Sequence, residues 1–303
     1  VCDDNSCEYI EEVNLGEDIT TCDDSVTLDA GSGYSSYDWS TGENTQTIEV
    51  NETGNYTVDV GNNSSESIEN NYSMNFDYGV QDIVYVDYYN ELNASNLTVS
   101  FWTFPESYCW EGNANCQSTP IARYEGQNGG EVFRTSWSDQ EFYVEIANSQ
   151  LEYLYVYADP LPLNEWSHIA FSYNGEELKL YVNGLLVDTE YGNGFVLQNM
   201  SNSPLTFGEL IASNGNWYRI DGKLDDISIW NSELSNIQIE GYKNCPPSGS
   251  EDGLIGYWNF EEGPEEGQVI DVSGNGNNGT INGANYNEEV PEQNCQISSC
   301  SSY

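Results

Sequence analysis

Acidic side chains offer the first candidate chemistry in this sequence. Asp225 and Asp226 open a strand-like run, residues 225–230, that is otherwise mostly apolar. Two carboxylates in such a run are costly unless something pairs them. Calcium is one possible partner, because it takes roughly six to eight oxygen ligands from carboxylates, carbonyls and amides. Backbone amide groups are the other, and the residues alone give the two possibilities nearly equal weight.

A catalytic arrangement is the next possibility, and the sequence argues against one. One group of carboxylates consists of Glu261, Glu262, Glu265 and Glu266. It falls in a Gly/Pro turn, where nothing would hold the groups at the separation that glycoside hydrolysis needs. His168, the sole histidine, alternates along a strand beside Trp166, with no serine elbow or nearby base to form a triad. We therefore expect solvated glutamates, a histidine used in packing and a protein that is not an enzyme.

Aromatic residues could bind a sugar by stacking on its ring. Four candidates fall in predicted loops or at strand ends: Trp110, Trp137, Trp217 and Tyr218. Tyr153, Tyr155 and Tyr157 share one face of a predicted strand and would form a platform if that face were exposed. We favour the alternative, in which these rings cover a sheet face and only their hydroxyls reach water.

The eight cysteines indicate disulfides rather than a metal site. None forms a C-x-x-C pair, and a single histidine argues against zinc. We expect Cys109 and Cys116 to close a local loop, and Cys245 and Cys295 to bracket the C-terminal segment. Disulfides persist in oxidising compartments, so we expect an extracellular protein, secreted or held at a cell surface.

Charge narrows the possible partners. The net charge of −45, from 51 acidic and six basic residues, argues against binding nucleic acid or an anionic membrane, which both need a basic patch. No apolar run is long enough to insert into a bilayer. The 23 tyrosines, 9 phenylalanines and 8 tryptophans argue against a disordered chain. The acidity indicates either a saline or calcium-containing setting or simply a need for solubility.

Alternation of apolar and polar residues predicts β-strands along most of the chain. We expect a small β domain at 1–60, a polar linker at 61–71, a larger β domain at 72–245 and a further β segment at 246–303. Asn183 and Gly184 predict a hairpin, because both tolerate positive φ. Ser235 and Gln238 predict a capping box and one short helix, which Gly241 can end.

Five segments of the larger domain resemble motifs of the laminin-G-like, concanavalin-A-like family. They read MNFDYGVQDIV at 74–84, LTVSFW at 97–102, EWSHIAFSY at 165–173, LYVNG at 180–184 and GKLDDISIW at 222–230. The resemblance implies an all-β fold with an antiparallel jelly-roll sandwich. It also implies a calcium site near Asp77 and Asp82, with Asp225 or Asp226 supplied by an adjacent strand.

Residues 13–60 resemble an immunoglobulin-like repeat of large secreted bacterial surface proteins. The matching positions include Leu15, Gly16, Asp18, Cys22, Leu28, Ala30, Gly31, Tyr37, Trp39, Gly42, Gly54 and Tyr56. This resemblance implies a small immunoglobulin-like β-sandwich ahead of the larger one.

The C-terminal segment resembles strands that precede the 74–84 motif in this family, although here it follows that motif. The similar stretches read GLIGYWNFEEG at 253–263 and DVSGNGNNG at 271–279. The segment could complete its own sandwich by circular permutation, begin a further sandwich, or complete a neighbouring molecule in a head-to-tail polymer. We favour permutation, with the polymer second.

Two functions follow. The first is a non-catalytic extracellular adhesion or structural filament module, stabilised by calcium, whose partner is another copy of itself. The alternative is a calcium-dependent carbohydrate-binding module that takes surface glycans, either free or attached to a larger enzyme. Fold does not fix function, so the choice must come from the site.

Overall fold

The chain divides into two compact units. The computed structural model describes residues 15, 19–21, 25–31, 36–61, 70–78, 81–87, 95–108, 117–125, 130–198, 203–211, 217–264, 267–293 and 295. The small unit takes Val1–Glu69 together with Cys295–Tyr303, and the large unit takes Asn70–Asn294.

The described residues of the small unit form two pairs of antiparallel strands. β1 (Val26–Asp29) pairs with β3 (Thr47–Val50), and β2 (Ser36–Trp39) pairs with β4 (Val58–Gly61). Its buried core consists of Ala30, Trp39 and Ile48, and the Trp39 indole donates a 2.8 Å hydrogen bond to the carbonyl of Thr45. The β structure agrees with the predicted strands, whereas the immunoglobulin-like assignment stays a prediction.

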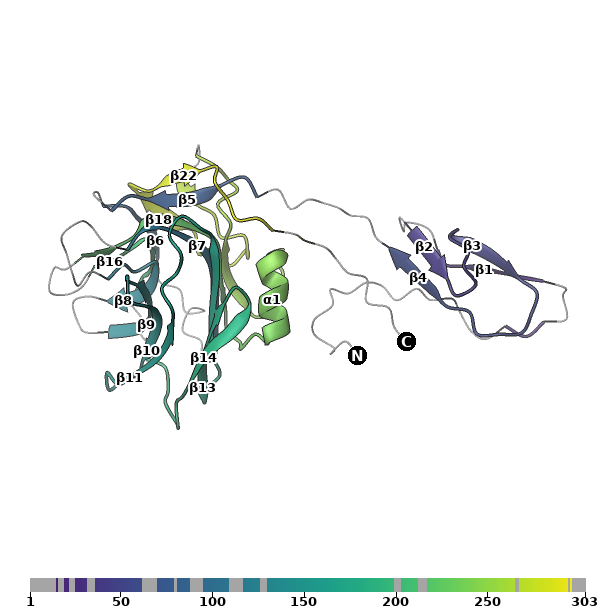
Figure 1. Cartoon of the computed structure of the whole chain (residues 1–303), viewed down its shortest axis with the longest axis horizontal. Helices are drawn as coiled ribbons and strands as arrows, with labels where there is room; N and C mark the ends of the chain where they lie inside the picture. The colour runs from purple at the N-terminus through teal and green to yellow at the C-terminus, as the bar shows by residue number, and fades with distance from the viewer. Residues whose placement is uncertain are drawn as a thin grey trace. The chain divides into compact units, whose positions relative to one another are not determined.

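Two antiparallel sheets face each other in the large unit (Figure 1). One, the tyrosine sheet, has the spatial order β11 (Tyr153–Ala158), β10 (Phe142–Ala147), β9 (Gly130–Trp137), β8 (Ile121–Glu125), β15 (Leu205–Phe207), β6 (Ile83–Val86), β21 (Gly279–Asn282) and β20 (Gln268–Val269). The other, the helix sheet, runs β14 (Leu185–Tyr191), β13 (Glu177–Val182), β12 (Ser167–Tyr173), β7 (Leu97–Ser107), β18 (Asp221–Trp230), β5 (Ser73–Phe76) and β22 (Asn285–Asn287), with β19 (Leu254–Trp258) also on β18. A short pair joins β16 (Glu209–Ile211) to β17 (Trp217–Arg219). The predicted all-β jelly-roll sandwich is confirmed.

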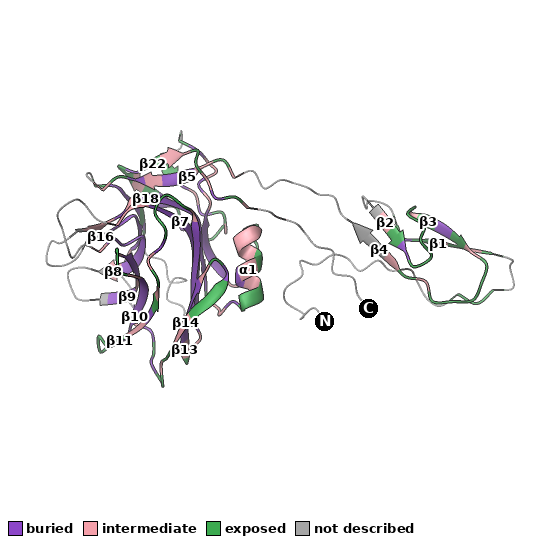
Figure 2. Ribbon diagram, viewed as in Figure 1, coloured by how far each residue is buried: buried purple, intermediate pink, exposed green. Residues whose placement is uncertain are grey.

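The core lies between the two sheets, where Figure 2 shows buried strands facing one another. Its residues follow the period-two rule. In β10, Phe142, Val144 and Ile146 point into the core and have no exposed surface. Each such side chain stabilises the fold by about 1.5–3 kcal/mol. The intervening residues of the same strand are therefore placed on the outer face of the tyrosine sheet.

One helix, α1 (Asn236–Asn244), covers the outer face of the helix sheet. Ile239 packs there against Tyr181 and Trp230. The predicted capping box is present, with Ser235 and Gln238 bonded to each other's backbone N–H groups. The helix continues to Asn244, three residues beyond the Gly241 expected to end it. No helix in the described ranges has the length and apolarity that crossing a bilayer takes.

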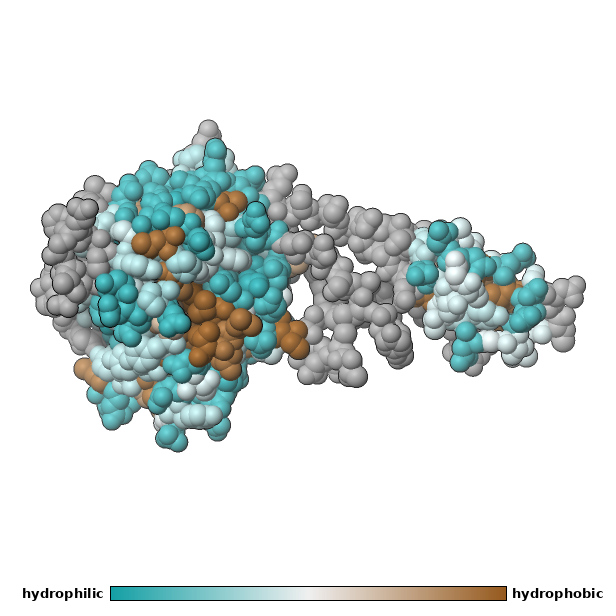
Figure 3. Space-filling view, viewed as in Figure 1, coloured by the Kyte–Doolittle hydropathy of each residue, from teal (hydrophilic) through white to brown (hydrophobic). Residues whose placement is uncertain are grey.

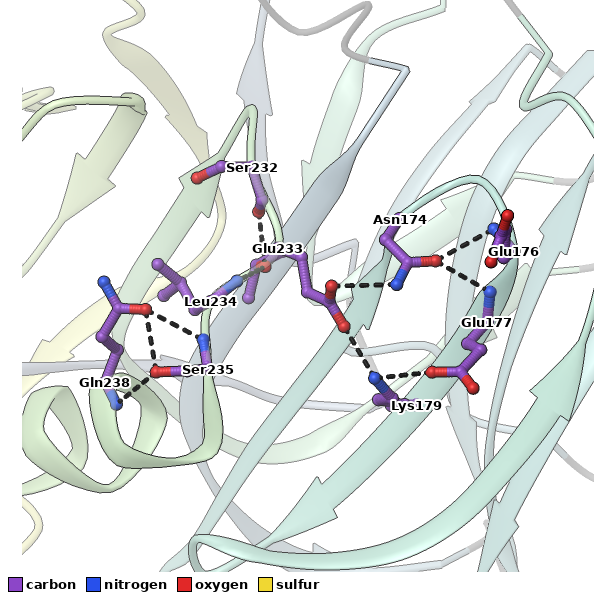
Figure 4. Close-up of polar contacts among 10 residues, drawn as sticks. Asn174, Glu176, Glu177, Lys179, Ser232, Glu233, Leu234, Ser235 and Gln238 are labelled. Carbon is purple, nitrogen blue, oxygen red and sulfur yellow. Dashed lines mark hydrogen bonds and ion pairs between the residues drawn. The ribbon is translucent and has the colours of Figure 1, made fainter. Parts of the chain in front are cut away.

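A polar network fixes the connection into α1 (Figure 4). Lys179 of β13 lies between two carboxylates, 2.7 Å from Glu177 and 2.8 Å from Glu233. The side-chain amide of Asn174 donates a further 2.9 Å hydrogen bond to Glu233. The segment before the helix is thereby held on the helix sheet.

The C-terminal segment forms strands within the same sandwich. β19 pairs with β18, β21 with β6, and β22 with β5. Trp258 of β19 is fully buried, with its ring centroid 5.2 Å from that of Phe207. Both sheets therefore need residues from beyond position 250 to reach their full width.

We expect Trp258→Ala to lower the free energy of unfolding by about 3–5 kcal/mol, because it opens a cavity between the sheets. Denaturant unfolding measures this, and Val272→Ala, at a partly exposed valine of the same segment, should change stability by less than about 1 kcal/mol. The midpoint should not depend on protein concentration. A midpoint that rises with concentration, together with head-to-tail oligomers, would show that the segment works in a neighbouring molecule.

Candidate functional site

A row of tyrosines crosses the outer face of the tyrosine sheet at its edge. Tyr153, Tyr155 and Tyr157 alternate along β11 with inward-facing residues, and we call them the tyrosine ladder. Neighbouring ring centroids lie 6.0 and 6.1 Å apart, and the Tyr155 and Tyr157 rings are within 18° of parallel. Tyr153 is 37% and Tyr157 45% exposed. The ladder therefore offers aromatic surface to a ligand, which the sequence analysis considered but did not favour.

Strand register places charged groups beside the ladder. Tyr155 lies opposite Glu145 of β10, which lies opposite Arg134 of β9, so the three side chains share one face. In the next row, Tyr157 lies opposite Tyr143, whose ring centroid is 6.2 Å from its own. Aromatic and charged residues thus form adjoining rows across three strands.

Arg134 is the centre of a buried ion-pair network on this face. Its guanidinium contacts the Glu145 carboxylate, lies 3.7 Å from Glu131 and donates a 3.0 Å hydrogen bond to the Tyr143 hydroxyl. It also lies 5.7 Å from the ring centroid of Tyr218. Glu131 and Glu145 are 5% and 3% exposed, so both carboxyl groups lie beneath the aromatic surface.

Burial changes the protonation of this network. It raises the pKa of Glu131 to about 9, helped by the hydrogen bond and charge of Glu145. Burial also raises the pKa of Tyr143 to about 12 and moves that of Tyr155 further upward. At neutral pH the face therefore holds a neutral Glu131, one Arg134–Glu145 ion pair and protonated phenols. Such a surface can stack on a ring and exchange hydrogen bonds, with no spare positive charge for an anion.

The four aromatic residues proposed from the sequence are placed differently. Trp137 lies in β9 with no exposed surface and belongs to the core, so its expected role in stacking on a sugar is wrong. Inward-facing Phe142 lies opposite it, and this register fixes its direction. Trp110 lies outside the described residues, as does the side chain of Trp217. Tyr218 is half-buried beside Arg134.

The four candidate calcium ligands lie as two pairs. Exposed Asp77 donates its backbone N–H to buried Asp82, at 2.8 Å. Asp225 and Asp226 are buried in a bulge of β18, where burial raises the pKa of both, that of Asp226 to about 6. In the part of the chain that the structure describes, no three Asp, Glu, His or Cys side chains gather closely enough to hold a metal ion. A calcium site among these four aspartates stays a prediction.

Protein donors pair all four carboxylate oxygens of Asp225 and Asp226. Asp225 accepts hydrogen bonds from the Asp226 N–H at 2.8 Å and the Asn70 amide at 3.0 Å. Asp226 accepts from the Tyr257 hydroxyl and the Gln293 amide, both at 2.5 Å. One donor is a backbone amide, the alternative to calcium that the sequence offered, and the other three are side chains.

A different pair of carboxylates is left incompletely paired. Asp82 Oδ1 and Glu209 Oε1 are buried and have no hydrogen-bond partner among the described residues. Burial and the charge of Asp82 raise the pKa of Glu209 to about 7, although Arg219 lies 3.3 Å from its other oxygen. Sequence reasoning missed Glu209, because β16 and the 74–84 motif meet only in the folded chain.

The remaining predicted residues have structural partners. His168 is buried and uncharged, with Nε2 2.9 Å from the Ser100 hydroxyl and a pKa lowered by burial to about 3. Glu261 accepts hydrogen bonds from the N–H groups of Asn71 and Tyr72, so its expected solvation is wrong.

Glu262 likewise accepts from the Ile270 N–H and the Tyr286 hydroxyl, and it too is not solvated as expected. Glu265 and Glu266 lie outside the described residues.

The cysteines are described in part. Cys245 and Cys295 are both disulfide-bonded. That they bracket the C-terminal segment as one bond stays a prediction. Cys109 and Cys116 lie outside the described residues.

Comparisons with known proteins place this fold. Residues 78–240 match the laminin G model described as the concanavalin A-like lectin/glucanases superfamily. No curated protein sequence matches the chain.

Among solved structures, a Bacteroides ovatus protein assigned to carbohydrate binding is 16% identical, covers 83% of this chain and 78% of its own, and has a TM-score of 0.55. A heptameric SAP-like pentraxin of Limulus polyphemus is 15% identical over 72% of this chain and 94% of its own, with a TM-score of 0.49. The carbohydrate-binding module CBM40 of the Ruminococcus gnavus IT-sialidase, bound to sialyllactose, is 12% identical over 55% and 94%, with a TM-score of 0.44. The first of these supports the fold.

We expect Glu131→Gln to flatten the pH dependence of stability. Between about pH 4.5 and 9 the folded chain keeps the Glu131 proton and the unfolded chain does not, so raising the pH across this window favours unfolding. Melting temperatures from pH 4 to 9 should fall less steeply in Glu131→Gln than in the wild type. The exposed Glu165→Gln is the control and should keep the wild-type slope. Equal slopes in all three proteins would mean that Glu131 is ionised at neutral pH.

Proposed function

The chain belongs to the concanavalin A-like lectin/glucanases superfamily, and from this membership we propose that its sandwich is a carbohydrate-binding module that acts outside the cell. The observation that carries the proposal is the exposed tyrosine ladder on the open face of the tyrosine sheet. The fold shared with the Bacteroides ovatus protein supports it as well. Carbohydrate binding therefore replaces adhesion as the leading function.

The ladder supplies the contacts that a sugar needs. The apolar face of a pyranose packs on aromatic rings, and its hydroxyls exchange hydrogen bonds with polar groups at the margin. Here those groups are phenolic hydroxyls, which the raised pKa values of Tyr143 and Tyr155 keep protonated. Because Arg134 is already paired with Glu145, the proposed ligand is a neutral glycan.

Hydrolysis is the competing function, and the geometry of the carboxyl groups disfavours it. Glu131 and Glu145 are close enough to share a hydrogen bond. Glycosidases hold their two carboxyl groups roughly 5–9.5 Å apart, so that the sugar or a water fits between them. We therefore propose binding without catalysis.

The wider setting extends the proposal. We infer that the protein is secreted or displayed on a bacterial surface, supported by the disulfide-bonded Cys245 and Cys295 and by the net charge of −45. We also propose that the small unit is an immunoglobulin-like spacer. Head-to-tail assembly for adhesion is the second candidate, and the concentration dependence of unfolding described above tests it.

We expect Tyr157→Ala to weaken glycan binding by about fivefold or more, since one aromatic contact is worth about 1 kcal/mol. A glycan array identifies the ligand, and calorimetry then measures the variant. Tyr191→Ala is the matched control, because Tyr191 is 61% exposed and lies on β14, outside the row of rings that forms the ladder. If the wild type retains no glycan, or if both variants bind as the wild type does, the ladder is not a sugar site.

Calcium is the second part of the proposal, with Asp82 and Glu209 as the residues that would hold it. The unpartnered oxygens of both support this choice. A bound ion would neutralise this buried charge, so a chelator should lower the melting temperature of the wild type and have no effect on Asp82→Asn. Asp225→Asn with Asp226→Asn should keep the chelator effect. Loss of the effect in that double variant would place the ion at the double aspartate instead, and no effect on the wild type would remove calcium.

A further inference from the structure

A pocket lies where the tyrosine ladder ends. It has a volume of about 370 Å³, and Tyr157, Asp159, Leu161, Ser167, Val182 and Val187 are among its lining residues. We call it the end pocket. Tyr157 belongs to both the ladder and the pocket, so a chain of sugars lying on the ladder can reach the pocket with its last residue.

The pocket lies at one edge of the sandwich, where the two sheets meet. β11 and β14 are the outermost strands of the two sheets, on the same side of the core. The Asp188 carboxylate of β14 accepts a 2.8 Å hydrogen bond from the Tyr157 N–H of β11, which joins the two edges beside the pocket. A register shift in β13–β14 leaves Val187 as an extra residue with a side chain 46% exposed.

Apolar surface surrounds the pocket on the β14 side. Figure 3 shows hydrophobic side chains gathered over this part of the face. Leu185 and Leu186 are 70% and 50% exposed next to Val187. With Val182 and Leu161 in the wall, the pocket offers contact to a methyl or other apolar group.

The pocket also holds a buried hydroxyl that no protein group pairs. Ser167 is 1% exposed, and its Oγ has no hydrogen-bond partner among the described residues. Thr103, opposite it on β7, has an unpartnered Oγ1 as well. A buried hydroxyl left unpaired is unfavourable, so a polar group of a ligand that enters this pocket would gain the bond.

Charge limits what that ligand can be. Asp159 lines the pocket and Asp188 adjoins it, while no basic side chain is among the lining residues. An anionic sugar would meet repulsion there. The volume is at the lower end of the range for ligand pockets, which suits one sugar residue rather than several.

Resting on the proposed carbohydrate function, we propose that the end pocket binds the N-acetyl group of a terminal, neutral N-acetylhexosamine. The acetamide is the substituent that combines both requirements. Its methyl packs on Val182 and Val187, and its amide pairs with the Ser167 hydroxyl. The ladder then holds the sugars that precede this terminal residue.

The test compares sugars that differ only in the acetamide. N-acetylglucosamine and N-acetylgalactosamine are titrated against glucose and galactose into the full chain, followed by nuclear magnetic resonance. At least one acetylated sugar should bind ~10-fold or more tightly than its parent hexose.

Two pocket variants and two controls locate the preference. Ser167→Ala and Val187→Asp should reduce it to within ~2-fold. Val196→Asp, at a valine 71% exposed and outside the pocket lining, should keep it. Tyr153→Ala should weaken the binding of longer glycans but keep the preference. Because the Ser167 hydroxyl has no protein partner, its removal should leave the melting temperature unchanged.

The outcomes separate the two proposals. A preference that survives both pocket variants, or equal binding of the acetylated and parent sugars, overturns the pocket assignment and leaves carbohydrate binding in place. If no sugar or longer glycan binds the wild type, the proposed function itself fails. A crystal structure with the sugar on the ladder and only water on Ser167 would also overturn the assignment.

Discussion

Scarcity of positive charge is the constraint on which this structure depends. Ion pairs with described glutamates are made by at least five of the six basic residues, namely Arg134, Lys179, Arg219, Lys223 and Lys243. Several of these pairs join segments that are distant in sequence. Lys223 of β18 contacts Glu106 of β7 and lies 3.1 Å from Glu289 near the C-terminal end of the large unit. The other buried carboxyl groups are stabilised in two ways. Glu131 keeps its proton, and Asp225 accepts several hydrogen bonds. A protein with its cations committed in this way has little to offer an anionic ligand.

The outer faces of the two sheets have different roles. The outer face of the helix sheet is covered by α1 and serves packing, with Trp230 and Tyr257 buried in the cluster that contains Ile239 of the helix. The tyrosine sheet keeps part of its outer face open. Around the ladder its outward residues include aromatic rings and paired charges, which can be exposed or half-buried without an aggregation-prone apolar surface. Binding chemistry therefore collects on the face that the fold does not need to cover.

Turn and helix-capping signals in the sequence predicted much of the local structure. The Asn183–Gly184 turn has positive φ at both residues, 52° and 81°, and the capping box at Ser235 is formed. The site was harder to predict, because it depends on which strands become neighbours. Arg134 and Glu145 meet only through the register of β9 and β10. That Glu145 alternates with apolar residues, and that Arg134 is one of six basic residues, were signals in the sequence. Trp137 was misplaced because a residue in a loop or at a strand end was expected to be exposed, whereas its pairing opposite Phe142 turns the side chain into the core.

The large unit begins and finishes at one place. Asn70, its first residue, donates a 3.3 Å hydrogen bond to Gln293, which lies one residue before its end. The small unit takes chain from both sides of this point. A domain whose termini are adjacent can be inserted into another protein without disrupting the fold of that protein. The sandwich could therefore be inserted as a domain into a surface loop of an unrelated protein, by evolution or by a protein engineer. Its two neighbouring ends would be joined to the two ends of that loop.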